Sequence, residues 1–148
     1  MADYIINSDT LLLIPLDEDV CKIVEKEREI IIKTTVMDVI NNSCLYFGCS
    51  LQGRIEGTKY LLNCSYKLPI VVDNHNDLIF FPTLSYTSSK CHWISFNNIE
   101  SYTKKDKNNT LIKFNNQNTY VIPTTLSSFE NQYFRSLRLH SILIKKDK

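Results

Sequence analysis

The sequence predicts a single α+β domain built on a mainly antiparallel sheet. Short runs of β-branched and aromatic residues, separated by turns rich in Asn and Asp, occupy residues 59–122 and indicate a meander of antiparallel strands. Helical spacing of apolar residues over 36–47 and from 127 onward predicts one helix before the meander and one at the end of the chain. With 43% apolar residues, a chain of 148 residues buries its own core. We therefore expect one domain over 1–148.

The N-terminal part of the chain predicts two pairs of strands. Tyr4–Ile6 and Leu11–Ile14 flank three turn-forming residues and suggest a first hairpin. Val20–Lys33 has the Glu and Lys content of a charged helix, but its β-branched cluster Ile30–Ile32 favours two strands instead. We predict a second hairpin there.

All three glycines of the chain, Gly48, Gly53 and Gly57, lie within 42–58. Such a cluster indicates backbone geometry that other residues resist, so we expect a loop that the other elements frame. The plainer alternative is a pair of tight turns around a short helix. The preceding helix, over Val36–Phe47, is expected to stop at Gly48. The glycine spacing matches neither a phosphate-binding loop nor a dinucleotide fingerprint.

The clearest hairpin in the sequence pairs Pro69–Asp73 with Leu78–Phe81 across the turn Asn74–Asp77. Other apolar runs predict one strand before this hairpin and four after it. These strands are Lys59–Tyr66, Trp93–Phe96, Ile99–Thr103, Leu111–Phe114 and Thr119–Ile122. Trp93 is expected to anchor the core.

The last helix is predicted from Ser127, which has capping-box spacing with Glu130. One stripe of this helix is expected to face the core. Its members are Phe129, Tyr133, Leu137, His140 and Ile144.

The charge of the chain is unevenly distributed although the net charge is only +1. Residues 1–30 carry eight acidic and three basic side chains, a balance of −5, which leaves +6 for residues 31–148. Segregation of this kind is typical of a basic face set apart from an acidic one. The sequence lacks a membrane-spanning apolar run and a signal peptide, so we expect a cytoplasmic protein without a membrane partner.

The chemistry-bearing residues do not predict an enzyme. The five cysteines include no C-x-x-C pair, which indicates reduced, mostly buried thiols, no metal and no cofactor. Cys91 adjoins His92, but neighbours on an extended strand point to opposite faces and do not form a nucleophile and base pair. No catalytic residues are expected.

Three segments resemble one known family. SCLYFGCSLQGRIEGT at 43–58, LPIVVDNHNDLIFFPTLSYTSSKCHWIS at 68–95 and SSFENQYFRSLRL at 127–139 occur in the order and spacing of the ComK family of competence transcription factors from low-GC Gram-positive bacteria. The resemblance implies an activator of DNA-uptake genes. It implies binding of double-stranded DNA at paired A/T-rich boxes, largely through the minor groove, by a dimer or higher oligomer.

The DNA-contacting residues are expected among basic and polar side chains in and beside the matching segments. Of the cations, Arg54, Lys67 and Arg135 coincide with family positions, whereas Lys90 does not. Arg54, flanked by glycines, would enter a narrow minor groove, or as a plainer alternative pair with Glu56 on the surface. The other cations would neutralise phosphates, and the hydroxyl groups would donate hydrogen bonds. His92 replaces a residue that is usually Gly in the family. The predicted set is Arg54, Lys59, Lys67, Ser85, Thr87, Lys90, His92 and Arg135.

The family also has a C-terminal extension linked to activation and to recognition by an adaptor of the Clp protease. The sequence stops at Lys148, and we expect most of that extension to be absent. The alternative function is therefore that of a truncated paralogue, a protein-interaction or regulatory module without activation.

Overall fold

Six antiparallel strands form the main sheet of the computed structural model, which describes residues 4–75 and 77–146. The strands lie in the order β3-β2-β1-β6-β5-β4. Their bounds are β1 (Thr10–Asp17), β2 (Val20–Glu25), β3 (Glu29–Ile32), β4 (Ile70–Asp73), β5 (Leu78–Pro82) and β6 (Trp93–Ser95). In the centre, β1 pairs with β6 so that Leu12 lies opposite Ile94 and Leu13 opposite Trp93. The predicted α+β class is confirmed.

A second, smaller sheet follows the 3-10 turn Phe96–Asn98. It contains β7 (Ile99–Asp106), β8 (Asn109–Phe114) and β9 (Thr119–Ile122), each antiparallel to its neighbour. The strands predicted within 69–122 are therefore present, but they form two sheets where we expected one continuous meander. Asn98 fixes the change of direction, because its side-chain amide donates to the carbonyl of Ser8 at 3.2 Å and to Ser95 Oγ at 2.9 Å.

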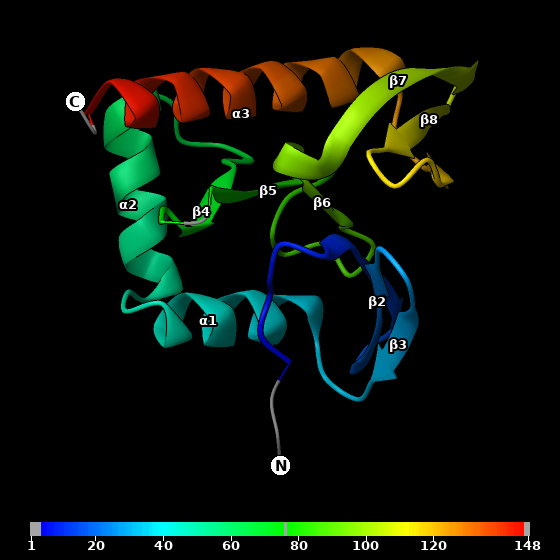
Figure 1. The fold of residues 1–148 in the computed structure, drawn as a ribbon, viewed down its shortest axis with the longest axis horizontal. Helices are drawn as coiled ribbons and strands as arrows, with labels where there is room; N and C mark the ends of the chain where they lie inside the picture. The colour runs from blue at the N-terminus through cyan, green and yellow to red at the C-terminus, as the bar shows by residue number, and fades with distance from the viewer. Residues whose placement is uncertain (1–3, 76, 147–148) are drawn as a thin grey trace.

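The main sheet is covered on both faces. Helix α1 (Val36–Tyr46) lies on one side, and α3 (Leu126–Lys146) lies on the other with the small sheet beside it (Figure 1). Alternation along the strands supplies both faces: Leu13 and Trp93 join the core cluster of α1, while Leu12 and Ile94 join the cluster that contains Phe129 of α3. Trp93 is fully buried, as predicted for a core anchor.

Helix α1 matches the predicted helix. Thr35 caps its start, since Thr35 Oγ1 accepts a hydrogen bond from the Asp38 amide at 3.0 Å. Beyond its end, Gly48 has a φ of +93°, a conformation in which glycine carries no steric penalty. The expected stop at Gly48 is confirmed.

The predicted glycine loop is wrong, and the plainer alternative of turns around a helix is closer, because Gly53 and Gly57 lie in helix α2 (Leu51–Leu62). Ser50 caps this helix by accepting from the Gly53 amide at 3.0 Å, and Asn63 ends it in the left-handed conformation with a φ of 53°. Gly53 lies where a Cβ would be 2.8 Å from Cys49 Sγ, so a packing contact, not a turn, accounts for it. The strand predicted over Lys59–Tyr66 is wrong for the same reason.

The first predicted hairpin is also wrong, while the second is confirmed. Tyr4–Ile6 forms no strand; the Ile6 amide donates to Ser43 Oγ of α1 at 2.9 Å instead. Strand β1 pairs with β2, and β2 pairs with β3 as predicted for Val20–Lys33. The hairpin of β4 and β5 is confirmed as well. Asn76, within its predicted turn, lies outside the described residues.

Helix α3 is confirmed with a shifted cap and a shifted buried face. Thr125, not Ser127, caps it, because Thr125 Oγ1 accepts from the Ser128 amide at 3.2 Å. Leu137 and Ile144 of the predicted stripe are each 46% exposed. The buried side consists of Phe129, Gln132, Ser136 and Leu139. None of the helices among the described residues has an apolar stretch that would span a lipid bilayer.

Candidate nucleic-acid interface

Three segments enclose a groove of about 280 Å³, called the basic groove below. Its lining comes from one face of α2, from the turn at 65–68 after α2, and from the loop at 85–87. The structure brings four predicted residues together there: Lys59, Lys67, Ser85 and Thr87. Gln52, Ile55, Ser65, Tyr66, Leu68 and Tyr86 complete the lining.

The helix α2 presents Lys59 to the groove because of its position in the helical repeat. Gln52, Ile55 and Lys59 follow one another at spacings of three and four, which places them on one side of the helix. Asn63 then turns the chain away from the helix axis, which leads into the turn that carries Lys67.

Lys67 has a left-handed backbone conformation, with a φ of 51°. This conformation costs roughly 1–2 kcal/mol in a residue with a Cβ, so other contacts must hold it. Gln132 of α3 supplies them: its side-chain amide donates to the Lys67 carbonyl at 2.7 Å and to the Pro82 carbonyl at 2.9 Å. One buried amide thus fastens the turn to the end of β5.

Arg135 lies beside the same turn, one helical turn after Gln132. Its Nη1 donates to the Tyr66 carbonyl at 2.7 Å and to Gln132 Oε1 at 3.1 Å. The predicted residue Arg135 therefore adjoins the basic groove. Tyr66 itself is 62% exposed.

Tyr86 joins the two walls of the groove. Its hydroxyl donates to the Leu68 carbonyl at 2.5 Å, and its ring packs on Trp93 at 5.1 Å between centroids. Burial raises the pKa of the Tyr86 hydroxyl, which keeps it a proton donor. On either side of Tyr86, Ser85 Oγ and Thr87 Oγ1 lie 3.1 Å apart. The loop thus holds two hydroxyl groups beside the lysines.

No Asp or Glu in the described part of the chain lines the basic groove. Among the described residues, Lys59, Lys67 and Arg135 form no ion pair. Uncompensated cations with neighbouring hydroxyl groups are the donor set that binds phosphate oxygens. This arrangement is suited to a polyanion.

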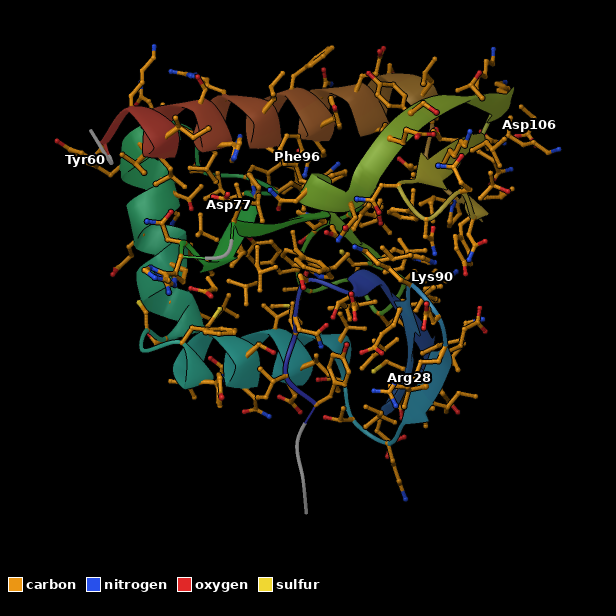
Figure 2. All side chains as sticks on the ribbon, viewed as in Figure 1. Arg28, Tyr60, Asp77, Lys90, Phe96 and Asp106 are labelled. Carbon is orange, nitrogen blue, oxygen red and sulfur yellow. The ribbon has the colours of Figure 1, made fainter. Side chains whose placement is uncertain are left out.

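Lys90 and His92 lie apart from the basic groove. They line a recess with Asp17, Glu18 and Pro123, and Figure 2 shows Lys90 near β2 and β3, far from Tyr60 of α2. His92 Nδ1 is 3.1 Å from the Lys90 carbonyl, and burial lowers the pKa of this imidazole. His92 is therefore neutral at pH 7 and supplies no charge to a phosphate.

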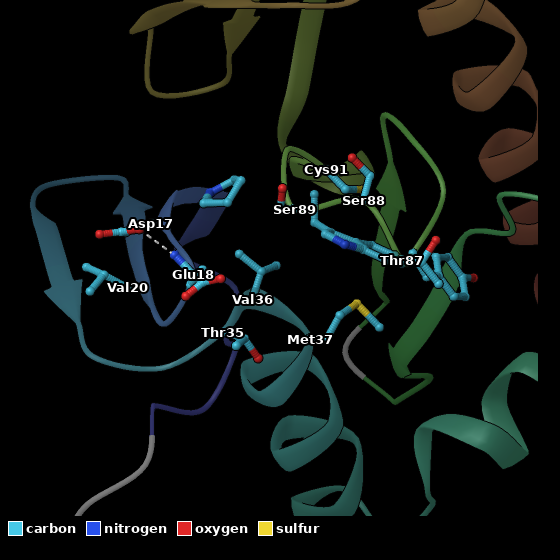
Figure 3. Close-up of a pocket in the computed structure, with 13 residues that line it drawn as sticks. Asp17, Glu18, Val20, Thr35, Val36, Met37, Thr87, Ser88, Ser89 and Cys91 are labelled. Carbon is cyan, nitrogen blue, oxygen red and sulfur yellow. Dashed lines mark hydrogen bonds between the residues drawn. The ribbon is translucent and has the colours of Figure 1, made fainter.

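An acidic pocket of about 260 Å³ lies on the far side of the loop that carries Thr87 (Figure 3). Asp17 and Glu18 stand between β1 and β2, opposite Met37 of α1. Most residues of the acidic N-terminal segment belong to β1, β2 and their turns. Asp17 and Glu18 of the acidic N-terminal segment thus lie apart from the basic groove.

Arg54 does not line the basic groove. Five residues before Lys59 on α2, it points about 140° away around the helix axis. Its Nη2 donates to the Val72 carbonyl of β4 at 3.4 Å, and its Nε is buried without a partner among the described residues. The expectation that glycine-rich loop backbone carries Arg54 is wrong, because α2 is a helix.

The thiols are free and mostly buried. Cys21, Cys44 and Cys91 are buried, and burial raises the pKa of Cys44 to about 11. Burial also raises the pKa of Cys91, which therefore stays a thiol and a poor nucleophile beside His92. Within residues 4–75 and 77–146, no three His, Cys, Asp or Glu side chains are grouped to hold a metal ion.

Sequence reasoning missed Gln132 and Tyr86, the two residues that hold the groove together. Gln132 could have been identified from the sequence, because it lies three positions after Phe129 and therefore on the buried face of the helix, where a polar side chain is unusual. A buried amide there requires partners. Tyr86 had no such signal, since its partner Leu68 lies 18 residues away.

A family model and a similar protein both assign the chain to the same family. The chain matches the ComK protein family over residues 1–148. It is 33% identical to the competence transcription factor of Bacillus subtilis (strain 168) over 144 residues, which covers 95% of this chain and 75% of that protein. No solved structure matches it. The chain belongs to the ComK family.

Proposed function

We propose that this protein is a DNA-binding transcriptional activator of competence genes and that the basic groove holds the DNA duplex. The observation that carries the proposal is the convergence of Lys59, Lys67 and Arg135, without a carboxylate, at one groove. Family membership supports it, because the matching relative is a competence transcription factor. Family membership also argues against an enzyme.

The cations act by neutralising phosphates and releasing condensed counterions, a contribution that does not depend on sequence. Ser85 and Thr87 supply hydroxyl groups that donate hydrogen bonds to the same DNA phosphates. Preference for A/T-rich boxes then comes from the width and negative potential of their minor groove, which reward an inserted arginine. Arg135, which adjoins the groove, is the proposed inserted arginine, and its insertion would require Nη1 to leave the Tyr66 carbonyl, 2.7 Å away. Insertion of Arg54 would require its guanidinium to leave the Val72 carbonyl.

We expect the remaining partners to follow from the same role. A chromosomal target places the protein in the cytoplasm, and paired boxes are occupied by a homo-oligomer. An adaptor of the Clp protease is a further partner implied by family membership. Each is open to direct measurement in solution.

Electrophoretic mobility shifts on A/T-rich and G/C-rich duplexes test the proposal. The wild type should bind both and prefer the A/T-rich duplex. Arg135→Ala should cost on the order of 1–3 kcal/mol on the A/T-rich duplex and less on the other. Arg54→Ala, with its side chain directed at β4, should change neither affinity. Failure of the wild type to bind either duplex would refute the proposal and favour the protein-interaction module.

A further inference from the structure

Strand β3 forms an uncovered edge of the main sheet. It is the terminal strand, and no described strand pairs with its outer side. The opposite edge, β4, is packed against α2. Ile31, in the middle of β3, is 67% exposed. An open edge with an exposed apolar side chain is a template for another strand.

The side chains around Ile31 alternate between the two faces of the sheet. Ile30 and Ile32 pack against the core cluster under α1. Glu29 and Ile31 are exposed on the outer face, and Lys33, the exposed residue directly after the end of β3, continues the same interval of two. Along the outer face of this edge, an acidic, an apolar and a basic side chain therefore follow one another in chain order.

That pattern is complementary to itself. If two copies of β3 run antiparallel with Ile31 opposite Ile31, each Glu29 lies opposite Lys33 of the other copy. Sliding one copy by two residues sets each Ile31 against a charged side chain, and sliding it by four sets like charges opposite each other. Sliding one copy by one residue pairs side chains that face the core with side chains on the outer face. A single register is therefore favoured.

We propose that a second copy of this chain pairs with β3 in that register and joins the two main sheets across a two-fold axis. The contact is isologous, as in most homodimers, because each side supplies the same residues. Glu29 Oε1 already lies 3.5 Å from Lys22 Nζ, so Lys33 of the second copy extends an existing ion pair. Residues 20–33 carry four basic and three acidic side chains, so the joined edges are close to neutral.

The position of β3 leaves the DNA site open. Figure 1 shows β3 on the side of the molecule away from α2, which lines the basic groove. The dimer therefore carries two grooves at separate places, each able to take its own DNA segment. This step rests on the proposed function; the strand pairing does not.

Cross-linking tests the register without DNA. Ile31→Cys should form disulfide-linked dimers on mild oxidation, because directly opposed residues of antiparallel strands have the Cα separation of a disulfide. Glu29→Cys and Lys33→Cys should not cross-link alone but should do so when mixed. Val121→Cys, exposed on the edge strand β9, is the matched control and should stay monomeric on the gel, as should the wild type with its native thiols.

Sedimentation velocity over a concentration series tests the association itself. The wild type should sediment as a dimer and Ile31→Lys as a monomer with unchanged circular dichroism, while Val121→Lys should remain dimeric. A dimeric Ile31→Lys variant, or cross-linking of Ile31→Cys no stronger than that of Val121→Cys, would overturn the pairing. Ile31→Lys should still bind a duplex with a single A/T-rich box. If the wild type also failed to bind that duplex, only the proposed function would be refuted.

Discussion

At the scale of single residues, one proposed DNA contact, Lys67, has a strained backbone conformation. Lys67 has a left-handed backbone that a residue without a Cβ would adopt freely. The Gln132 amide holds this turn through the Lys67 carbonyl. Strain retained at a surface residue with an uncompensated charge indicates a side chain kept for what it binds.

Lys67→Gly and Lys67→Ala separate the charge from the strain. Both remove the ammonium group and should weaken DNA binding equally. Only the glycine variant relieves the left-handed backbone, so it should be more stable to unfolding than the alanine variant by about 1 kcal/mol. Urea denaturation and mobility shifts measure the two effects. Equal stabilities would show that the backbone at this position is unstrained.

His92 predicts how stability depends on pH. Burial lowers the pKa of His92 below the value of about 6.5 that it has in an unfolded chain, so the folded state takes up a proton less readily. Above pH 6.5 His92 is neutral in both the folded and the unfolded state, and the free energy of unfolding is at its full value. As the pH falls below 6.5, the unfolded state takes up the proton more readily, so the free energy of unfolding decreases. His92→Gln should reduce the change in thermal melting temperature between pH 7 and pH 5. Parallel profiles for the wild type and His92→Gln would contradict this.

At the scale of elements, the sequence predicted correctly those helices and hairpins whose stabilising contacts lie close together in the chain. Helix α1 was predictable because the helical spacing of its apolar residues and its stop, Gly48, are both local in the sequence. The hairpin of β2 and β3 closes within a few residues in the same way. By contrast, Ile6 bonds to Ser43, 37 residues away, so no local pattern showed that the first segment would leave the sheet.

Helix α2 escaped prediction because glycine opposes helix formation by about 1 kcal/mol per residue relative to alanine. Its two internal glycines have different surroundings. A Cβ at Gly57 would meet nothing within 4 Å, whereas one at Gly53 would meet Cys49 Sγ. Tertiary packing against β4 and α3 overrode the propensity.

Gly57→Ala tests the helix directly. The added methyl group has open space and favours helical backbone, so the variant should be more stable by roughly 1 kcal/mol. Gly53→Ala should gain nothing or lose stability because of Cys49. Thermal unfolding of both variants decides between them. If residues 51–62 formed the loop that the glycines suggest, Gly57→Ala would bring no such gain.

At the scale of the whole molecule, the site is assembled from segments that are distant in the chain. Lys59, Lys67, Ser85 and Thr87 were all predicted from the sequence, but only the fold brings them to one groove and places Arg54 and Lys90 elsewhere. The sequence also indicated that acidic and basic residues are segregated along the chain, but not where either group lies in the fold. Strand β1 sits in the middle of the main sheet, and its pairing with β6 sets Asp17 and Glu18 beside the loop at 85–92.

The central claim is that the basic groove neutralises DNA phosphates, and the salt dependence of binding tests it most directly. Removal of one lysine that neutralises a phosphate should reduce the slope of log affinity against log salt by about 0.9. The double variant Lys59→Ala with Lys67→Ala should therefore flatten the slope by about 1.8. The charge-matched control, Lys26→Ala with Lys105→Ala, should keep the wild-type slope, because neither lysine lines the groove. Equal slopes for the groove variant and the wild type would contradict the account.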